Sequence, residues 1–279
     1  MVLKIAITGS TGLVGSRIVA LLQDTIQFRP LLQEEIDITD RDSVWKFLNG
    51  IQYDILLHLA AYTNVDKAEQ ERKLTYRINV EGTRNLFECV ANRNKKFIYI
   101  STDFVFDGTN PPYDETSRPN PVGYYGQTKF EGEEVVKNNS MIVRIAYPYG
   151  NSPAEKKDFV RSLKYLLEQG RKLTMIEDSL ITPTYIDDIA FGLEHLIKHF
   201  SPEIFHLVGS QVLSSFDSAL LIAKMFQLDT SLIEKTTFEK YYKNNLIRPK
   251  LSHIVSKKNN FHRMRSFAEG LAIMKNMIL

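Results

Sequence analysis

The stretch VLKIAITGSTGLVGSRIVALLQ, residues 2–23, sets the expected fold class. Its first part, up to Gly9, is a short run rich in β-branched residues that ends at a glycine, which predicts a buried strand. GSTGLVG follows, and SRIVALLQ then has the apolar spacing of a helix. A strand, a glycine loop and a helix in this order form the first half of a β-α-β unit.

The loop carries glycines at 9, 12 and 15, spaced G-x-x-G-x-x-G and not in the commoner G-x-G-x-x-G pattern. Gly9 allows a tight turn after the strand, Gly12 lets the backbone approach a pyrophosphate, and Gly15 lets the helix pack close to the sheet. The helix N-terminus, with its free N–H groups, then faces the phosphates. We therefore expect a dinucleotide to bind here, against Gly9, Thr11, Gly12, Leu13, Val14 and Gly15.

The alternation of strands and helices continues to about Gly150. Strands are predicted over residues 53–61, 95–102 and 141–147, whereas 29–36 is a poor strand candidate. Helices are predicted after a cap at Thr39 or Asp40, over about 74–92, and over 122–136. Strands that alternate with helices indicate a parallel sheet with helices on both faces.

After Gly150 the regular alternation of predicted strands and helices ends. Helices are predicted over 159–169, from about Asp187 with carboxylates as caps, and over 215–226, with short strands at LTMIED and IFHLVG. The remainder is more basic and less regular. We expect an α/β protein with a Rossmann-type doubly wound parallel sheet and a smaller C-terminal α+β substrate-binding domain. The first domain spans 1–150 and is rejoined by about 181–208, and 151–279 forms mainly the second.

The bulk composition is that of an ordinary globular protein. The 279 residues are 43% hydrophobic and 24% charged, with a net charge of +2 that gives no support to a nucleic-acid or membrane partner. The lysine pairs at 95–96, 156–157 and 257–258, and the pair Asp66 and Lys67, are expected to be solvated surface. A single cysteine, Cys89, fits a reducing compartment, and no apolar stretch is long enough for a membrane span, so we expect a cytoplasmic protein. The histidines show no metal-ligand spacing, and we predict no metal site.

YYGQTK, residues 124–129, contains a candidate acid catalyst. On a helix, residues four apart share a face, so Tyr125 lies beside Lys129 whereas Tyr124 lies beside Thr128. The spacing alone is weak, because a chain with 13 tyrosines contains about one Tyr-x-x-x-Lys by chance. A surface helix with an incidental Tyr–Lys pair is the alternative.

Nine blocks of the chain, in order, resemble the dTDP-4-dehydrorhamnose reductase family of the extended short-chain dehydrogenase/reductases. They are GSTGLVGS, EIDITDRDSV, DILLHLAAYTNVDKAE, RINVEGTRNL, ISTDFVFDG, PYDETSRPNPVGYYGQTKFEGE, RIAYPYG, SLITPTYIDDIA and FHLVGS. The resemblance extends to about Ser252. The combination of AAYTNVDKAE, STDFVFDG and YGQTKFEGE is highly specific, although no single block is.

The resemblance implies a Rossmann fold that binds NADPH or NADH and a C-terminal domain that binds a nucleotide sugar. The implied reaction is reduction of a 4-keto sugar, with dTDP-L-rhamnose as the prototype product. The catalytic group would be Thr102, Tyr125 and Lys129. The cofactor would contact Gly12, Leu13 and Val14 at the pyrophosphate, Asp37 and Ile38 at the adenine, and Ala60, Ala61, Tyr62, Thr63, Tyr125 and Lys129 elsewhere. The substrate would contact Thr102, Asp103, Tyr147 and Arg248.

Ketone reduction agrees with those roles. The nicotinamide supplies a hydride and the protein supplies the acid. A free tyrosine has a pKa of about 10, and a neighbouring ammonium is expected to lower the pKa of Tyr125 toward working pH. Thr102 ends a predicted parallel strand, where sites in such sheets open. Ser101 is the rival hydroxyl, and because side chains alternate along a strand only one of the two should face the site.

Several alternatives stay open at this point. Glu34 and Glu35 would accept ribose hydroxyls and favour NADH, whereas Arg17 and Arg29 could favour the 2′-phosphate of NADPH. Asp103 is either a turn former or a substrate ligand. Asn79, in RINVEGT, either caps or bridges helix and sheet or serves a proton relay.

The chain departs from the family pattern at two places. Many members carry tryptophan where this chain has Tyr147, and the usual Arg-Arg-Pro is here Ile247-Arg248-Pro249, so one phosphate-binding cation is missing. Both changes put the identity of the sugar nucleotide in question. The second hypothesis is a non-catalytic nucleotide-binding subunit, since the chain also looks similar to the methionine adenosyltransferase β subunit. A homodimer is one open possibility for the oligomeric state.

Overall fold

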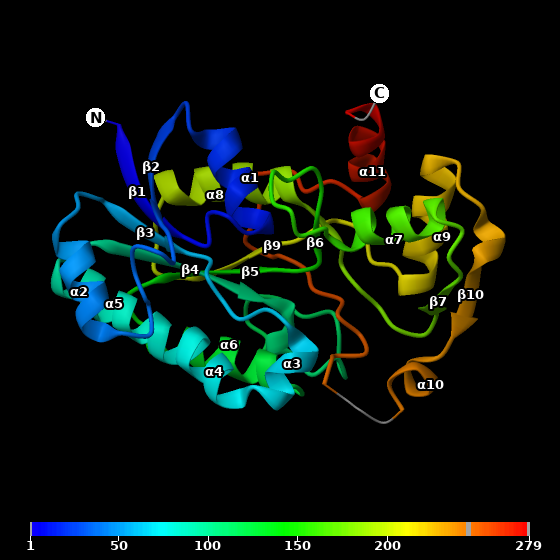
Figure 1. The fold of residues 1–279 in the computed structure, drawn as a ribbon, viewed down its shortest axis with the longest axis horizontal. Helices are drawn as coiled ribbons and strands as arrows, with labels where there is room; N and C mark the ends of the chain where they lie inside the picture. The colour runs from blue at the N-terminus through cyan, green and yellow to red at the C-terminus, as the bar shows by residue number, and fades with distance from the viewer. Residues whose placement is uncertain (1, 244–246, 278–279) are drawn as a thin grey trace.

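A computed structural model describes residues 2–243 and 247–277 (Figure 1). Its largest element is a six-stranded sheet in the order β2-β1-β3-β4-β5-β9, and every pairing in it is parallel. The strands are β1 (Leu3–Thr8), β2 (Ile26–Leu31), β3 (Ile55–His58), β4 (Lys96–Thr102), β5 (Met141–Ile145) and β9 (Ile204–Leu207). The predicted doubly wound parallel sheet is confirmed. The strand order reverses between β1 and β3, and ligands in such sheets bind at that point.

Two layers of helices cover the sheet (Figure 1). One face carries α1 (Leu13–Leu22) and α8 (Ile186–Lys198), which pack on each other above a core of aliphatic residues from all six strands and both helices. The other face carries α2 (Arg41–Asn49), α5 (Thr83–Asn92) and α6 (Tyr124–Val136), above a second core that includes Tyr53, Cys89 and Tyr99. Cys89 is buried there as a small apolar side chain, as its helical context predicts.

Among these five helices, only α2 begins with a side-chain cap. The Asp40 side chain accepts from the backbone N–H groups of Asp42 and Ser43, so the predicted cap of α2 is confirmed. The residue that caps α8 is Tyr185, which makes no side-chain cap bond, so the predicted carboxylate cap is wrong. Asp187 and Asp188 lie in the first turn instead, where Arg17 and Arg265 pair with them.

The helical stretch predicted over 74–92 is interrupted. It consists of α4 (Arg72–Tyr76), a π-helical segment η1 (Arg77–Gly82) and α5, and it follows the short α3 (Val65–Gln70). Asn79 lies in η1 and bridges two elements, because its amide accepts from Tyr62 N at 2.7 Å and donates to Thr128 Oγ1 at 3.0 Å. These contacts match the bridging alternative and fix the loop after β3 against α6. Wider π turns occur frequently at functional sites.

The C-terminal elements gather at one end of the sheet (Figure 1). They comprise two parallel two-stranded sheets, β6 (Pro148–Tyr149) with β8 (Thr184–Tyr185) and β7 (Leu173–Ile176) with β10 (Ile233–Thr236). Around them lie α7 (Phe159–Glu168), α9 (Ser215–Phe226), α10 (Phe238–Tyr242) and α11 (Phe267–Asn276). An aromatic core joins Tyr149, Tyr185 and Phe267, and ties this part to the rest.

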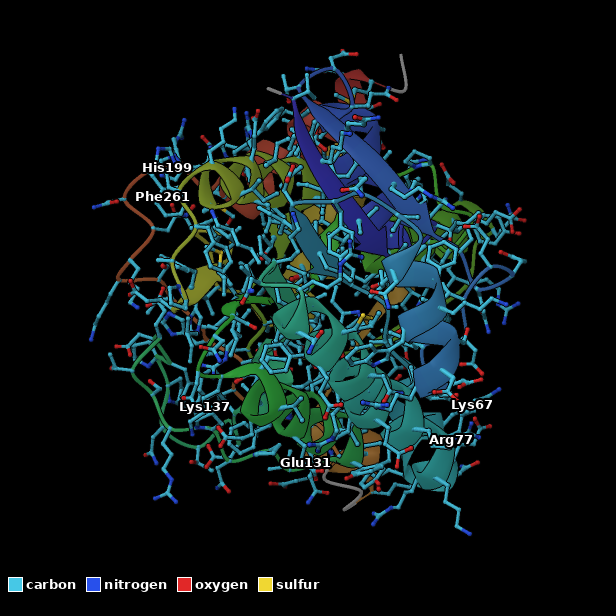
Figure 2. All side chains as sticks on the ribbon, turned by 90° about the vertical axis from the view of Figure 1, so that its left-hand side faces the viewer. Lys67, Arg77, Glu131, Lys137, His199 and Phe261 are labelled. Carbon is cyan, nitrogen blue, oxygen red and sulfur yellow. The ribbon has the colours of Figure 1, made fainter. Side chains whose placement is uncertain are left out.

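The segment before α11 returns across the first core. Figure 2 shows Phe261 near His199, the residue that follows α8, on the side of the molecule away from Lys67 and Arg77. The His195 ring stacks on Phe261 with centroids 4.3 Å apart, and Phe261 packs against the aliphatic core of α1 and α8. Over residues 2–243 and 247–277, no helix combines the length and apolar character needed to cross a membrane.

Candidate functional site

The glycine loop after β1 forms a tight turn with a bare outer surface. Gly9 has φ +68°, a conformation that favours glycine, and Gly12 N donates to Gly9 O at 3.0 Å. A Cβ at Gly15 would lie 2.2 Å from Gly9 O, so this glycine lets α1 start directly against the turn. A Cβ at Gly12 would meet only Gly9 O, at 3.2 Å, and would otherwise point into open space. That space lies at the N-terminus of α1 and fits a pyrophosphate.

Thr8 and His58 hold the loop after β3 next to the glycine loop. The N–H groups of Leu59 and Ala60 both donate to Thr8 Oγ1 at 3.1 Å. His58 Nδ1 lies 2.7 Å from the same oxygen, and its Nε2 lies 3.0 Å from Thr83 Oγ1. Burial, helped by the charge of Lys129, lowers the pKa of His58 to about 3, so the imidazole is neutral. It therefore acts as a structural bridge between β1, β3 and α5.

One long groove follows the carboxyl ends of the strands. Its two halves have volumes of about 570 and 510 Å³ and share Gly9, Thr11, Ala60 and Ala61. The groove brings together most of the residues predicted for the cofactor, from Asp37 and Ile38 at one end to Tyr125 and Lys129 at the other. Tyr62 lines neither half, since its hydroxyl donates to Glu71 Oε2 at 2.6 Å and its backbone N–H bonds Asn79.

The first half of the groove begins where β2 ends. Glu34 and Asp37 lie exposed on its wall, together with Arg77, which donates to Thr39 Oγ1 at 3.0 Å. The two arginines considered for a 2′-phosphate are engaged elsewhere: Arg29 makes two bonds to Glu35, at 2.9 and 3.2 Å, and Arg17 makes two bonds to Asp187, at 2.7 Å each. Neither lines the groove.

The second half contains the predicted catalytic group. A Cβ at Gly126 would lie 2.2 Å from Phe104 O, so this glycine lets α6 approach the end of β4 closely. The approach brings Tyr125 near Thr102, and both side chains line this half of the groove. The Phe104 ring packs edge-on against Tyr125 with centroids 5.6 Å apart. Helix geometry and the strand end thus place both hydroxyls in the groove.

The pKa of Tyr125 differs from the expectation. Burial of the hydroxyl raises the pKa of Tyr125, the charge of Asp103 raises it further, and the nearby Thr102 hydroxyl only partly offsets this rise. The phenol is therefore un-ionised near neutral pH, and the expected lowering of its pKa by the ammonium is wrong for this structure.

The Lys129 side chain explains the difference. Its Nζ donates to Ile100 O at 2.8 Å and lies 4.1 Å from the centre of the Tyr99 ring. Burial lowers the pKa of Lys129 to about 7, against the opposing charge of Glu133 one turn along α6. The ammonium is in the groove beside Tyr125 but is bonded to the strand backbone.

Asp103 and Ser101 flank Thr102. Asp103 is buried and accepts from Thr102 Oγ1 at 3.0 Å and from the hydroxyl of Ser252. Burial raises the pKa of Asp103 to about 6, with those two bonds opposing the shift. Ser101 and Thr102 both line the groove, and the Ser101 hydroxyl is buried without a hydrogen-bond partner among the described residues.

The two remaining residues predicted for the substrate, Tyr147 and Arg248, differ in their position relative to the groove. Tyr147 lines it, with a left-handed backbone at φ +39°, and its ring also borders an apolar cavity of about 220 Å³ between α7 and α9. Arg248 does not line the groove. Its guanidinium donates to both oxygens of Asp66, at 2.7 and 2.8 Å, while Asp66 and Lys67 are exposed, as the prediction of solvated surface had it.

Sequence reasoning missed Thr8, His58 and Lys156. The HLAA block after a buried strand could have signalled His58, but its partners Thr8 and Thr83 are remote in sequence. Lys156 was expected to be plain surface, yet it lines the groove and donates to Thr63 Oγ1 at 3.1 Å. No spacing rule links Lys156 to Thr63. In residues 2–243 and 247–277, no cluster of three or more histidine, cysteine or acidic side chains could hold a metal ion.

Comparisons with known proteins agree with this geometry. A family model described as the RmlD substrate binding domain matches residues 3–277. The dTDP-4-dehydrorhamnose reductase of Mycolicibacterium smegmatis is 34% identical over 231 residues, which cover 78% of this chain and 68% of that protein. The crystal structure of the Bacillus anthracis dTDP-4-dehydrorhamnose reductase in complex with NADP has a TM-score of 0.91 at 30% identity and covers 99% of this chain and 100% of that chain. Methionine adenosyltransferase 2 subunit beta of Bos taurus is 29% identical over 252 residues, 84% of this chain and 75% of that protein.

Proposed function

This chain belongs to the RmlD family of dTDP-4-dehydrorhamnose reductases, and on that premise we propose that it reduces the 4-keto group of a nucleotide sugar with NADPH or NADH. The observation that carries the proposal is that Thr102, Tyr125 and Lys129 line the same groove as the bare Gly12 surface. The groove fits a dinucleotide, because its glycine loop, its acidic end and its Tyr–Lys end lie in one line along the sheet. The nicotinamide, when bound, supplies the hydride.

The residues of this chain supply the proton and the orientation. Tyr125 carries a proton at neutral pH and gives it to the ketone oxygen of the substrate as negative charge develops there. The Thr102 hydroxyl, which donates to Asp103 in this structure, would turn its proton to the ketone oxygen to stabilise that charge. Lys129 lines the groove with Tyr125 and donates to Ile100 O, and with a pKa lowered to about 7 it supplies a positive charge there when it is protonated.

The domain division is part of the proposal. We assign residues 1–150 to cofactor binding, because they supply five strands of the large sheet and most of the groove. The stretch 181–208 rejoins this part, as β9 pairs with β5 and α8 packs on α1. The other residues of 151–279 would bind the nucleotide and sugar. We also propose a dTDP-linked sugar of the rhamnose type, a cytoplasmic location and a homodimer.

A panel of nucleotide-linked 4-keto sugars tests the proposed function. Loss of absorbance from NADPH or NADH should occur with at least one dTDP-linked 4-keto sugar, and the panel should include other nucleotides because of the changes at Tyr147 and Ile247. The methionine adenosyltransferase β subunit relatives supply the alternative of a nucleotide-binding partner subunit. Cofactor binding without oxidation across the whole panel, together with co-purification of a synthetase, would favour that alternative.

The Asp66–Arg248 pair predicts an effect on substrate affinity. Arg248 is the remaining arginine of the expected phosphate-binding motif, and Asp66, on α3, holds both of its terminal nitrogens. Because the Asp66 side chain is 68% exposed, its hold on Arg248 is partly screened by water. If Arg248 contacts the substrate diphosphate, Asp66→Asn should release it and lower the Kd for dTDP by about threefold to tenfold, as measured by calorimetry.

The matched control is Glu177→Gln, which removes the same charge from an exposed pair with Lys235 in the C-terminal part. It should leave the Kd for dTDP within about twofold of wild type. Arg248→Gln should weaken dTDP binding. An unchanged Kd in both Asp66→Asn and Arg248→Gln would remove Arg248 from the substrate site.

A further inference from the structure

The loop between β6 and α7, residues 151–157, crosses the groove, and we refer to it as the strap. On one side it is fastened to the glycine loop. Ser152 Oγ donates to Leu13 O at 2.8 Å and lies 2.9 Å from Ser16 Oγ. These contacts bring the strap to the N-terminus of α1, where the bare Gly12 surface lies.

On the other side the strap reaches the loop after β3. The contact is a single hydrogen bond from Lys156 Nζ to Thr63 Oγ1, at 3.1 Å. Both side chains are exposed, and the acceptor is a neutral hydroxyl, so this bond is easily exchanged for one to an anion. The strap is therefore strongly attached at Ser152 and weakly attached at Lys156.

Arg161 sets the shape of the strap from α7. Its guanidinium is paired with the buried Asp158 at 2.7 Å, and it donates to Ser152 O at 3.3 Å and to Lys156 O at 2.9 Å. One side chain thus holds the backbone at both ends of the strap. Lys156 is kept above the groove by this backbone, while its long side chain remains free to move.

Of the charged side chains that line this half of the groove, Lys156 is the cation placed to contact a phosphate. The lining of this half includes two cations, Lys129 and Lys156. Lys129 is 3% exposed and bonded to Ile100 O, so its ammonium is committed to the catalytic end. Lys156 lines the groove together with Gly12, Leu13 and Val14, where the dinucleotide phosphates would lie.

We propose that Lys156 is a cofactor ligand, whose ammonium leaves Thr63 and contacts the pyrophosphate of NADPH or NADH so that the strap covers the bound cofactor. This inference rests on the proposed function, because it takes the groove to be the cofactor site. The glycine loop offers the phosphates only neutral N–H donors and a partial helix charge, and Lys156 adds a full positive charge opposite them. The diphosphate of the substrate is the competing anion, which the test below separates.

Lys156→Met keeps the length of the side chain and removes its charge. Calorimetric titration with NADPH, in the absence of substrate, should show a Kd about tenfold higher than wild type. The rise of Kd with added salt should also be weaker in the variant, because one charge–charge contact has been lost. Lys156→Arg should restore the Kd to within about threefold of wild type.

The neighbouring Lys157 provides the control. Its ammonium lies 3.7 Å from the centre of the Tyr165 ring, so Lys157→Met makes the same chemical change on the same strap away from the groove. Its Kd for NADPH should stay within about twofold of wild type. Adenosine, which has no phosphate, should bind wild type and Lys156→Met equally.

Two results would overturn the inference. One is an NADPH Kd for Lys156→Met equal to that of Lys157→Met. The other is a larger loss of affinity for dTDP than for NADPH, which would assign Lys156 to the substrate diphosphate. Neither result depends on turnover, so a wild-type protein that binds NADPH but reduces no sugar would refute the proposed reaction and leave this inference standing.

Discussion

Tyr125→Phe is expected to lower kcat by about 10²- to 10⁴-fold while the Kd for NADPH changes by less than about twofold. The substitution removes one oxygen and keeps the ring that packs against Phe104. It removes the proton donor that lines the groove with Thr102, and the un-ionised state of this phenol is what makes it an acid at neutral pH. Stopped-flow oxidation of NADPH with a reducible keto sugar, together with calorimetric binding of NADPH, measures the two quantities.

Tyr124→Phe is the matched control for that experiment. Tyr124 is the neighbouring residue on α6, and its ring lies beneath the Arg72 guanidinium, 4.7 Å from ring centre to carbon. It lines neither half of the groove, so removal of its hydroxyl should leave kcat within about twofold. A wild-type rate in Tyr125→Phe would show that the proton comes from another group, and Asp103, with a pKa raised to about 6, would be the next to test.

The order of strands and helices in the first half of the chain could be predicted because apolar runs and caps are local signals. The second strand was predicted poorly, since β2 (Ile26–Leu31) is an edge strand with mixed burial and contains Pro30. The helix α11 was not predicted, although Ser266 and Glu269 form a capping box, and a Ser-x-x-Glu pattern in the sequence indicates such a helix start. In α11 the signal was present, because the buried residues Phe267, Gly270, Leu271 and Met274 follow helical spacing.

The parts of the site that depend on helix spacing and on family motifs could be predicted from the sequence. The i, i+4 rule correctly placed Tyr125 and Lys129 on one helix. The glycine loop, where a binding site was expected, lines a groove. Helix spacing does not predict which group the ammonium of a flexible lysine side chain will contact. Here the Lys129 ammonium donates to Ile100 O of β4. Lys156 and Thr63 are 93 residues apart, so only the folded chain brings them together.

Loss of either partner of the buried pair Arg144–Glu133 is expected to destabilise the protein by about 3–5 kcal/mol. Arg144 Nη2 lies 2.6 Å from Glu133 Oε2, and the two side chains are 1% and 3% exposed. Burial and the charge of Arg144 lower the pKa of His206 to about 4, so the neutral His206 Nε2 accepts from Arg144 at 3.4 Å and cannot replace it as a cation. Arg144→Met therefore leaves a buried carboxylate unpaired.

A double-mutant cycle in urea separates this cost from the net value of the pair. Arg144→Met and Glu133→Leu should each lower the free energy of unfolding strongly, whereas the double variant should recover most of the loss, because it buries apolar groups without a lone charge. Glu134→Gln, from the exposed pair with Lys137 at the end of the same helix, should change the free energy of unfolding by less than about 0.5 kcal/mol.

Because Glu133 lies one turn beyond Lys129 and pairs with Arg144 of β5, the pair also fixes α6 against the sheet. Single variants as stable as the Glu134→Gln control would mean that water enters and screens the charge, and the position of α6 would then depend on its other contacts, among them the Asn79–Thr128 bond and the close approach at Gly126.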